Sequence, residues 1–244
     1  MMMLTKRLAA PMAALALAAG ATAAQPVAAP ASQPVSQAET LLFETDHLER
    51  LRAPATLSYA FHKSGNVEPG FDDTVQLVLA QANGKKQASV HFLTGPRKHD
   101  IPAVDDAHGN PVLLGFLEYD IAAMKRRTGG STNYFRKRIR MALAEAARVT
   151  REPIAYGGQQ LQASVIRIQP YLNDPLHARF EKYVGKTYTF VVSEQVPGGV
   201  YQVRTALGTA TSRSAGAQPP AAKVGAPAVF EESLTLVKVA QSRH

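Results

Sequence analysis

The stretch NPVLLGFLEYDIAAMKRRTGGSTNYFRKRIRMALAEA (residues 110–146) predicts two helices joined by a glycine turn. Asn110 and Pro111 are typical of a helix start, because asparagine caps free backbone amides and proline suits the first helical position. Gly129 and Gly130 should end the first helix, and apolar residues recur at helical spacing on both sides of them. We therefore expect a two-helix hairpin here.

Seven basic side chains and no acidic one lie between residues 121 and 144. In an antiparallel helix pair the end of the first helix lies beside the start of the second, so these charges should form one patch. So much unopposed charge suggests an anionic partner. The candidate ligand-binding residues are Lys125, Arg126, Arg127, Arg136, Lys137, Arg138 and Arg140.

The sequence leaves two interpretations of this patch open. Basic residues in the last turn of a helix are favoured by its dipole, and Asp72, Asp73 or Glu118 could pair with the arginines on an ordinary surface. The second basic group lies near a helix N-terminus instead, where side chains and free amides together suit an anion. The patch is therefore either a solvated face or an anion-binding site.

Alternating apolar residues predict an antiparallel sheet around these helices. Residues 56–61 and 75–79 alternate, and Asn83-Gly84 is a hairpin signal leading to residues 90–92. Val196-Pro197-Gly198-Gly199 fits a type II turn. Further strands are expected at residues 161–168, 187–193, 200–207 and 230–239, and a short helix capped by Asp174 at 175–183. The expected fold is α+β: a curved antiparallel sheet of about six or seven strands with the two-helix hairpin inserted and packed on one face.

The N-terminal region predicts export. A basic start, a short apolar run and small residues indicate a cleaved signal peptide at residues 1–24, which makes the protein periplasmic. Its removal takes away Lys6 and Arg7 and lowers the formal net charge from +8 to +6. The chain has no cysteine, which excludes disulfides and a lipid anchor. We expect a disordered tether at residues 25–38 and a single domain at 39–244 with a mobile loop at 209–227.

No motif in the sequence names a reaction, so we assign no catalytic residue, no metal site and no cofactor. Histidines and aspartates, which can bind metals, cluster in one expected loop, but their spacing matches no recognised metal-binding pattern. Tyrosines in the expected strands could line a pocket but are more typical of a core. The loop residues are His99, Asp100, Asp105, Asp106 and His108, and the tyrosines are Tyr59, Tyr171, Tyr188 and Tyr201.

The opening stretch, together with PYLNDP (170–175) and VPGG (196–199), resembles a group of exported proteobacterial proteins that carry no assigned function. More loosely, the chain is similar to the half-barrel periplasmic lipoprotein carriers. That resemblance implies a curved sheet with helices as a lid and an acyl chain between them.

These observations predict a periplasmic binding or envelope-assembly module that engages an anionic or amphipathic ligand through the basic hairpin. Its partner would be an anionic lipid, an envelope polymer or an acidic protein; export argues against nucleic acid. One alternative is a protein–protein interaction component of an envelope complex. Another is a hydrolase or metal-dependent enzyme that uses His99, Asp105 and His108.

Overall fold

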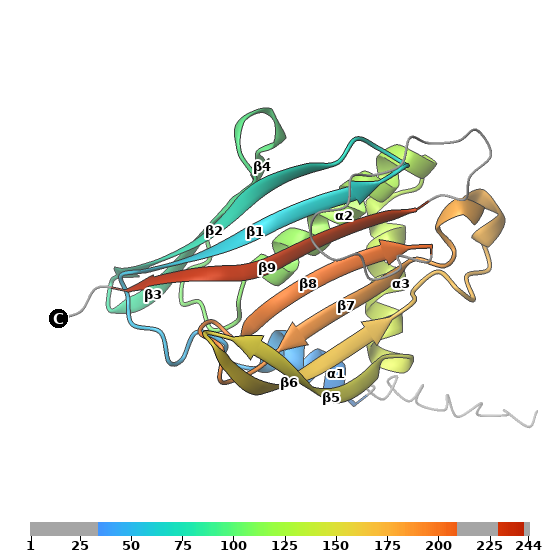
Figure 1. Cartoon of the computed structure of the whole chain (residues 1–244). Coiled ribbons are helices and arrows are strands. Elements are labelled where there is room, and N and C mark those ends of the chain that lie inside the picture. The colour runs from blue at the N-terminus through green and yellow to red at the C-terminus, as the bar shows by residue number, and fades with distance from the viewer. Residues whose placement is uncertain (1–33, 209–228, 242–244) are drawn as a thin grey trace, which may run out of the picture. The chain divides into compact units, whose positions relative to one another are not determined.

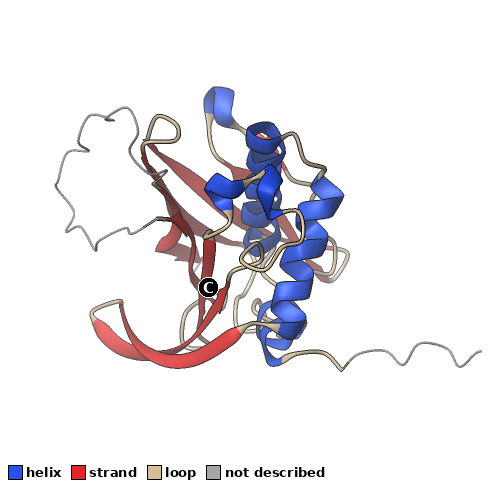
Figure 2. Cartoon of the chain, turned by 90° about the vertical axis from the view of Figure 1, so that its right-hand side faces the viewer, coloured by secondary structure: helices blue, strands red, loops and turns tan. Residues whose placement is uncertain are grey.

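The computed structural model describes residues 34–208 and 229–241. The predicted signal peptide and the predicted loop at 209–227 lie outside these residues, as does most of the predicted tether. The unit that begins at Val35 is one sheet with helices along one of its faces (Figures 1 and 2). In the described part of the chain, no helix combines the length and the apolar character needed to cross a membrane.

All nine strands of the sheet pair antiparallel, in the order β4-β3-β2-β1-β9-β8-β7-β6-β5. The C-terminal strand β9 lies between β1 and β8 and so joins an N-terminal and a C-terminal set of strands (Figure 1). The strands are β1 (Ala55–Gly65), β2 (Phe71–Ala82), β3 (Lys85–Phe92), β4 (His99–Asp100), β5 (Arg148–Tyr156), β6 (Gln159–Ile168), β7 (Thr187–Val192), β8 (Val200–Leu207) and β9 (Phe230–Gln241).

The predicted count of six or seven strands is wrong, because the sheet has nine. The two strands that the sequence analysis missed, β4 and β5, are the two edges of the sheet. β4 has only two residues, and β5 contains Pro153, which pairs opposite Gln162 of β6. Proline within a strand is confined to sheet edges, because it has no backbone N–H to donate to a neighbouring strand. A proline in the sequence therefore argues against a strand, and for this reason β5 was not predicted.

Helices α2 (Val112–Thr128) and α3 (Thr132–Glu145) occupy the stretch where the hairpin was expected. The prediction that these two helices pack on the sheet as a single hairpin insertion is nevertheless wrong. Although the two helices touch, α2 packs against β3 and β8, whereas α3 packs against β6 and α1. The two helices run at an angle behind the sheet and cover different strands (Figure 1).

The remaining helices are short. Helix α1 (Gln37–Glu39) continues into a π-helical turn, η1 (Thr40–Glu44). Ser36 caps α1 and Ala38 is buried, although both fall in the stretch assigned to a tether. The helix expected at 175–183 is instead two 3₁₀ turns, η3 (His177–Arg179) and η4 (Glu181–Tyr183); a third such turn is η2 (Gly95–Arg97).

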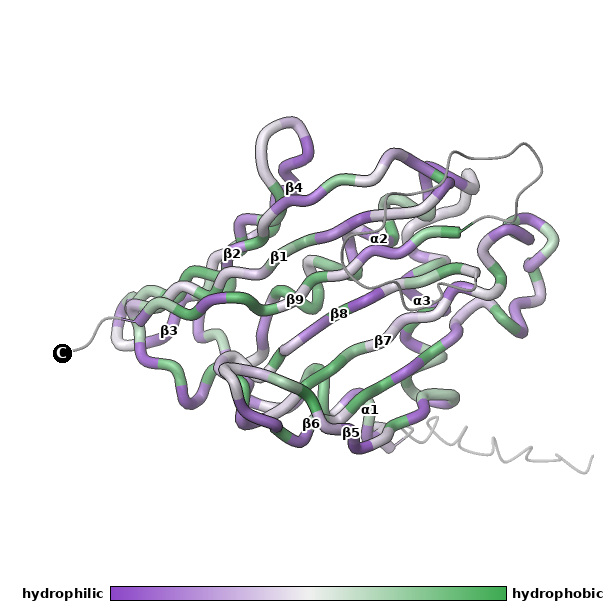
Figure 3. Tube along the Cα trace, viewed as in Figure 1, coloured by the Kyte–Doolittle hydropathy of each residue, from purple (hydrophilic) through white to green (hydrophobic). Residues whose placement is uncertain are grey.

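Large side chains fill the space between the sheet and the helices. Alternation along the strands, visible in Figure 3, turns one set of apolar residues toward α2 and α3. The ring of Phe61 lies 6.2 Å from that of Phe92 and 6.4 Å from that of Phe116, centre to centre. Each fully buried ring contributes about 1.5–3 kcal/mol. The largest fully buried aromatic residues are Tyr59, Phe61, Phe92, Phe116, Phe135, Tyr171, Tyr188, Phe190 and Phe230.

Candidate functional site

The seven basic side chains predicted to bind a ligand fall into two groups. Three of them, Arg127, Arg136 and Arg138, form ion pairs with carboxylates. The other four are exposed, and no carboxylate pairs with them among the described residues. These four, Lys125, Arg126, Lys137 and Arg140, are called the exposed basic surface below.

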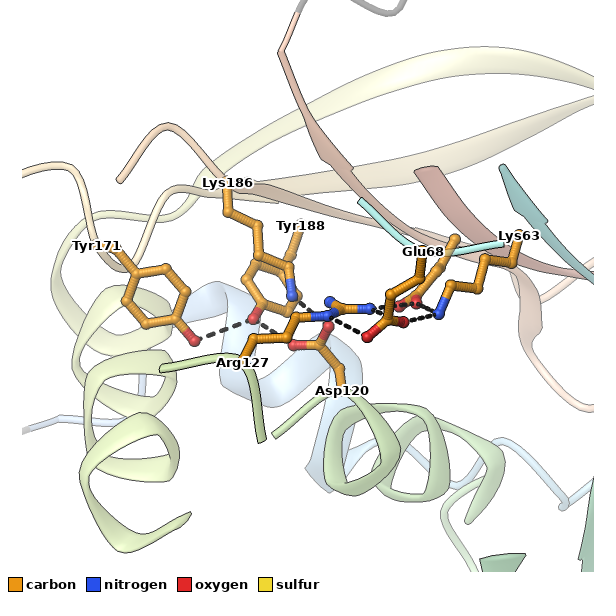
Figure 4. A network of polar contacts seen from close by, with 8 residues as sticks. Lys63, Glu68, Asp120, Arg127, Tyr171, Lys186 and Tyr188 are labelled. Carbon is orange, nitrogen blue, oxygen red and sulfur yellow. Dashed lines mark hydrogen bonds and ion pairs between the residues drawn. The ribbon is translucent and has the colours of Figure 1, made fainter. Parts of the chain in front are cut away.

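Arg127, at the end of α2, points into the protein. Its guanidinium donates to both carboxylate oxygens of Glu68, with Nε–Oε1 and Nη2–Oε2 distances of 3.1 and 2.7 Å. It also donates to Glu232 Oε1 at 3.3 Å, and its side chain is only 5% exposed. Lys63 Nζ pairs with the same two carboxylates, at 3.2 Å from Glu232 Oε1 (Figure 4).

A second group of buried polar side chains adjoins the first. Asp120, on α2, accepts hydrogen bonds from the ammonium group of Lys186 and from the hydroxyl of Tyr188, the latter at 2.6 Å. The hydroxyls of Tyr188 and Tyr171 are 3.0 Å apart. Figure 4 shows the two groups side by side. We call these side chains the buried ionic cluster, although Glu68 is 30% exposed. The cluster has three cations and three carboxylates: Lys63, Arg127, Lys186, Glu68, Asp120 and Glu232.

Burial and pairing perturb the acid–base properties of this cluster. The Arg127 guanidinium, helped by Lys63, lowers the pKa of Glu68 to about 2. Burial lowers the pKa of Lys186, and the charge of Asp120 opposes that shift. Perturbed groups of this kind often mark active sites. Here, however, Asp120, Lys186 and Tyr188 are fully buried, so they are placed to hold α2 on the sheet and not to meet a substrate.

The other two paired arginines lie on α3. Arg136 binds Glu118 of α2 through two hydrogen bonds, of 2.9 and 2.7 Å, at the surface. Arg138 Nε lies 2.8 Å from Oδ2 of the buried Asp174. Asp174 also accepts a hydrogen bond from the hydroxyl of Tyr134. Asp174 therefore fastens the segment between β6 and β7 to α3.

The residues with metal-ligand chemistry that were expected in a loop have other partners, and two of them, His99 and Asp100, form strand β4. Within the set, His108 Nε2 lies 3.8 Å from Asp106 Oδ1. His108 Nδ1 lies 2.7 Å from Asp46, while Asp106 pairs with Lys85 at 2.6 Å. The Asp105 carboxylate accepts from the amide of Gln87, and Asp100 pairs with Lys98. Among the described residues, no group of three or more such side chains is arranged to hold a metal ion.

Of the four tyrosines considered as pocket residues, three are core residues and one lines a surface depression. Tyr59, Tyr171 and Tyr188 are fully buried. Tyr201 lines a depression of about 230 Å³ together with Val165 and Arg204. Residues next to these in the strands face the helix-covered core, so the depression lies on the opposite face of the sheet.

Comparison with known proteins yields only weak similarities. No protein-family model and no curated protein matches the chain. The lipoprotein LppX of Mycobacterium tuberculosis is similar over 78% of this chain and 88% of its own, with 8% identity and a TM-score of 0.30. A LolA superfamily protein of Nitrosomonas europaea is similar over 85% of this chain and 94% of its own, with 10% identity and a TM-score of 0.22. The loose resemblance to lipoprotein carriers is found again at this weak level, which carries no argument about ligand or mechanism.

Proposed function

We propose that the chain is an exported binding module that engages an anionic partner through the exposed basic surface. The observation that carries this proposal is the division of the seven cations. Three are neutralised by carboxylates, while four remain in solvent without one among the described residues. The four define a narrower site than the seven residues predicted from sequence.

The four cations come from both sides of one short connection. Lys125 and Arg126 are in the last turn of α2, and Lys137 and Arg140 are in the first part of α3. At a rise of about 1.5 Å per residue, the α3 pair lies within about 14 Å of the start of that helix. The stretch 121–144 itself contains no acidic residue. Grouped like charges of this kind attract and steer anionic partners.

The packing of the interior favours a ligand on the outside. An acyl chain between sheet and helices, as in the carriers that the sequence loosely resembles, would have to occupy space that Phe61, Phe116 and Phe190 fill. Long, exposed lysine and arginine side chains instead suit distributed negative charge. With a periplasmic location, as the signal peptide predicts, such charge is supplied by anionic lipids, envelope polymers or acidic proteins.

Binding to polyphosphate, a soluble polyanion, tests the proposal. We expect the full chain to bind it and the double reversal Lys137→Glu/Arg140→Glu to weaken binding by about tenfold or more. The matched control is Arg52→Glu/Lys238→Glu, which changes the net charge by the same amount. Both residues are exposed and lie near the C-terminal end of β9, away from Glu232. An equal loss of polyphosphate binding in both variants would show that binding depends on the net charge and not on this site. Unchanged binding in the first variant would refute the site.

A further inference from the structure

Two exposed leucines lie in the segment between β6 and β7. The side chains of Leu172 and Leu176 are 50% and 39% exposed. A single exposed leucine is common on protein surfaces and means little. This pair differs from a single exposed leucine because it lies near charged side chains of α3.

The segment is held firmly against α3 between and beyond these leucines. The buried carboxylate of Asp174 accepts a hydrogen bond from the Tyr134 hydroxyl and forms an ion pair with Arg138, both on α3. Phe180 packs its ring 6.1 Å from that of Phe135 and 6.4 Å from that of Tyr134, centre to centre. These contacts fix where the leucines stand.

The two leucines therefore lie near Lys137, an exposed cation of α3. Leu172 and Leu176 are each two residues from Asp174, so their Cα atoms lie within about 7 Å of it. Tyr134 contacts Asp174, and the exposed Lys137, three residues further on, lies on the same side of α3 as Tyr134.

A further cation of the segment also lies beside α3. Arg179 is exposed, and its charge opposes the rise to about 12 in the pKa of Tyr134 that burial and Asp174 cause. Between residues 172 and 182 the exposed acidic residue is Glu181, since Asp174 is buried and paired. The surroundings of the two leucines are thus predominantly positive.

We infer that this face binds the surface of an anionic lipid bilayer. Lys137 and Arg179 meet the phosphate head groups, and Leu172 and Leu176 enter the boundary between head groups and acyl chains. Exposed apolar side chains flanked by cations suit a surface that is both anionic and apolar, whereas a soluble polyanion would use the cations alone. This inference rests on the proposed function and names its partner.

Vesicles of equal parts phosphatidylglycerol and phosphatidylcholine test the inference by co-sedimentation with the full chain. We expect Leu172→Ser/Leu176→Ser to reduce vesicle binding by about tenfold or more, because two apolar side chains no longer enter the bilayer. Its binding to polyphosphate should stay at the wild-type level. The control is Leu114→Ser, which removes a leucine that is 54% exposed at the start of α2, about 16 Å along that helix from Lys125.

The outcomes separate this inference from the proposed function. If the leucine variant sediments with vesicles as the wild type does, or if it loses vesicles and polyphosphate equally, the bilayer inference is overturned. Wild-type binding to polyphosphate but not to vesicles would overturn it in favour of a polymer or an acidic protein. If the Lys137→Glu/Arg140→Glu variant still binds both polyphosphate and vesicles, both the bilayer inference and the proposed function are overturned.

Discussion

Arg126 and Arg127 are adjacent in the sequence, yet one is exposed and the other is in the buried ionic cluster. The difference arises because Arg127 faces Glu68 and Glu232, which lie 59 and 105 residues away in the chain. A buried charge is costly unless it is paired, so the three carboxylates of the cluster determine which cations can enter the interior. A basic residue beside the turn is a candidate for binding only if no such partner receives it.

Replacing Arg127 by methionine should destabilise the fold. Glu68 and Glu232 would then share Lys63 as their remaining cation, and breaking a buried pair on one side costs about 3–5 kcal/mol. Arg126→Met is the matched control and should change the free energy of unfolding by less than about 0.5 kcal/mol. Urea denaturation measures both. Similar effects of the two substitutions would contradict the assignment of Arg127 to the interior.

The low pKa of Glu68 predicts a stability loss in acid. Its ordinary pKa is 4.5 and its pKa in the folded protein is about 2, so the stabilisation is complete above pH 4.5 and is lost as the pH falls toward 2. Glu68→Gln should lower the free energy of unfolding at pH 7 and weaken its decline between pH 4.5 and 2. Urea titrations across this range measure both effects.

Glu152→Gln is the control for the acid effect. The pKa of Glu152 is also about 2, because Arg167 binds it, but both side chains of that pair are about 40% exposed. Solvent screening should make its contribution to stability small. Parallel pH profiles for wild type and Glu68→Gln would show that the Glu68 pair does not stabilise the fold.

The buried ionic cluster was visible in the sequence only as a break in pattern. Lys63 and Glu232 each take an inward position of a strand in which the other inward residues are apolar. Asp120 interrupts the apolar face of α2 in the same way. A polar residue at a core position signals a buried partner. Which residue pairs with which could not be read, because the partners come from distant parts of the chain.

At the scale of elements, local signals predicted best where the backbone conformation depends on nearby residues. The turn at residues 196–199 is confirmed: Gly199 N–H donates to Val196 O at 2.9 Å, and Gly198 has φ of +75°. The glycine end of α2 is confirmed by the left-handed conformation of Gly129. The angle between α2 and α3 was not predictable, since it depends on the strands that each helix covers.

Gly198→Ala should destabilise the fold more than an equivalent change in another turn. Gly84 has the same φ of +75°, and a methyl group there meets nothing within 4 Å. At Gly198 a methyl carbon would lie 2.4 Å from Cδ2 of Leu57, in the core. We expect a cost of about 1–2 kcal/mol for Gly84→Ala, from backbone strain alone, and a larger one for Gly198→Ala. Equal unfolding free energies of the two variants would contradict the packing of this turn against β1.

At the scale of the whole molecule, the long-range order of the sheet was beyond the sequence. Alternation predicted a strand at residues 230–239 but gave no reason to place it between β1 and β8, since pairing across a sheet is set by the complete set of strands. This placement brings Glu232 beside Lys63 and Arg127. Glu232 reaches the buried ionic cluster because the C-terminal strand lies between the two sets of strands. Of the seven predicted cations, the four without a carboxylate partner among the described residues are those assigned to binding.

The most direct measurement is the salt dependence of polyphosphate binding by the full chain and by the variant that neutralises the exposed basic surface, Lys125→Gln/Arg126→Gln/Lys137→Gln/Arg140→Gln. If the four cations carry binding, the wild-type affinity should fall about 100-fold between about 50 and 200 mM salt. The variant should bind weakly at every salt concentration while its free energy of unfolding changes little. Wild-type affinity and an unchanged salt slope in the variant would contradict the account.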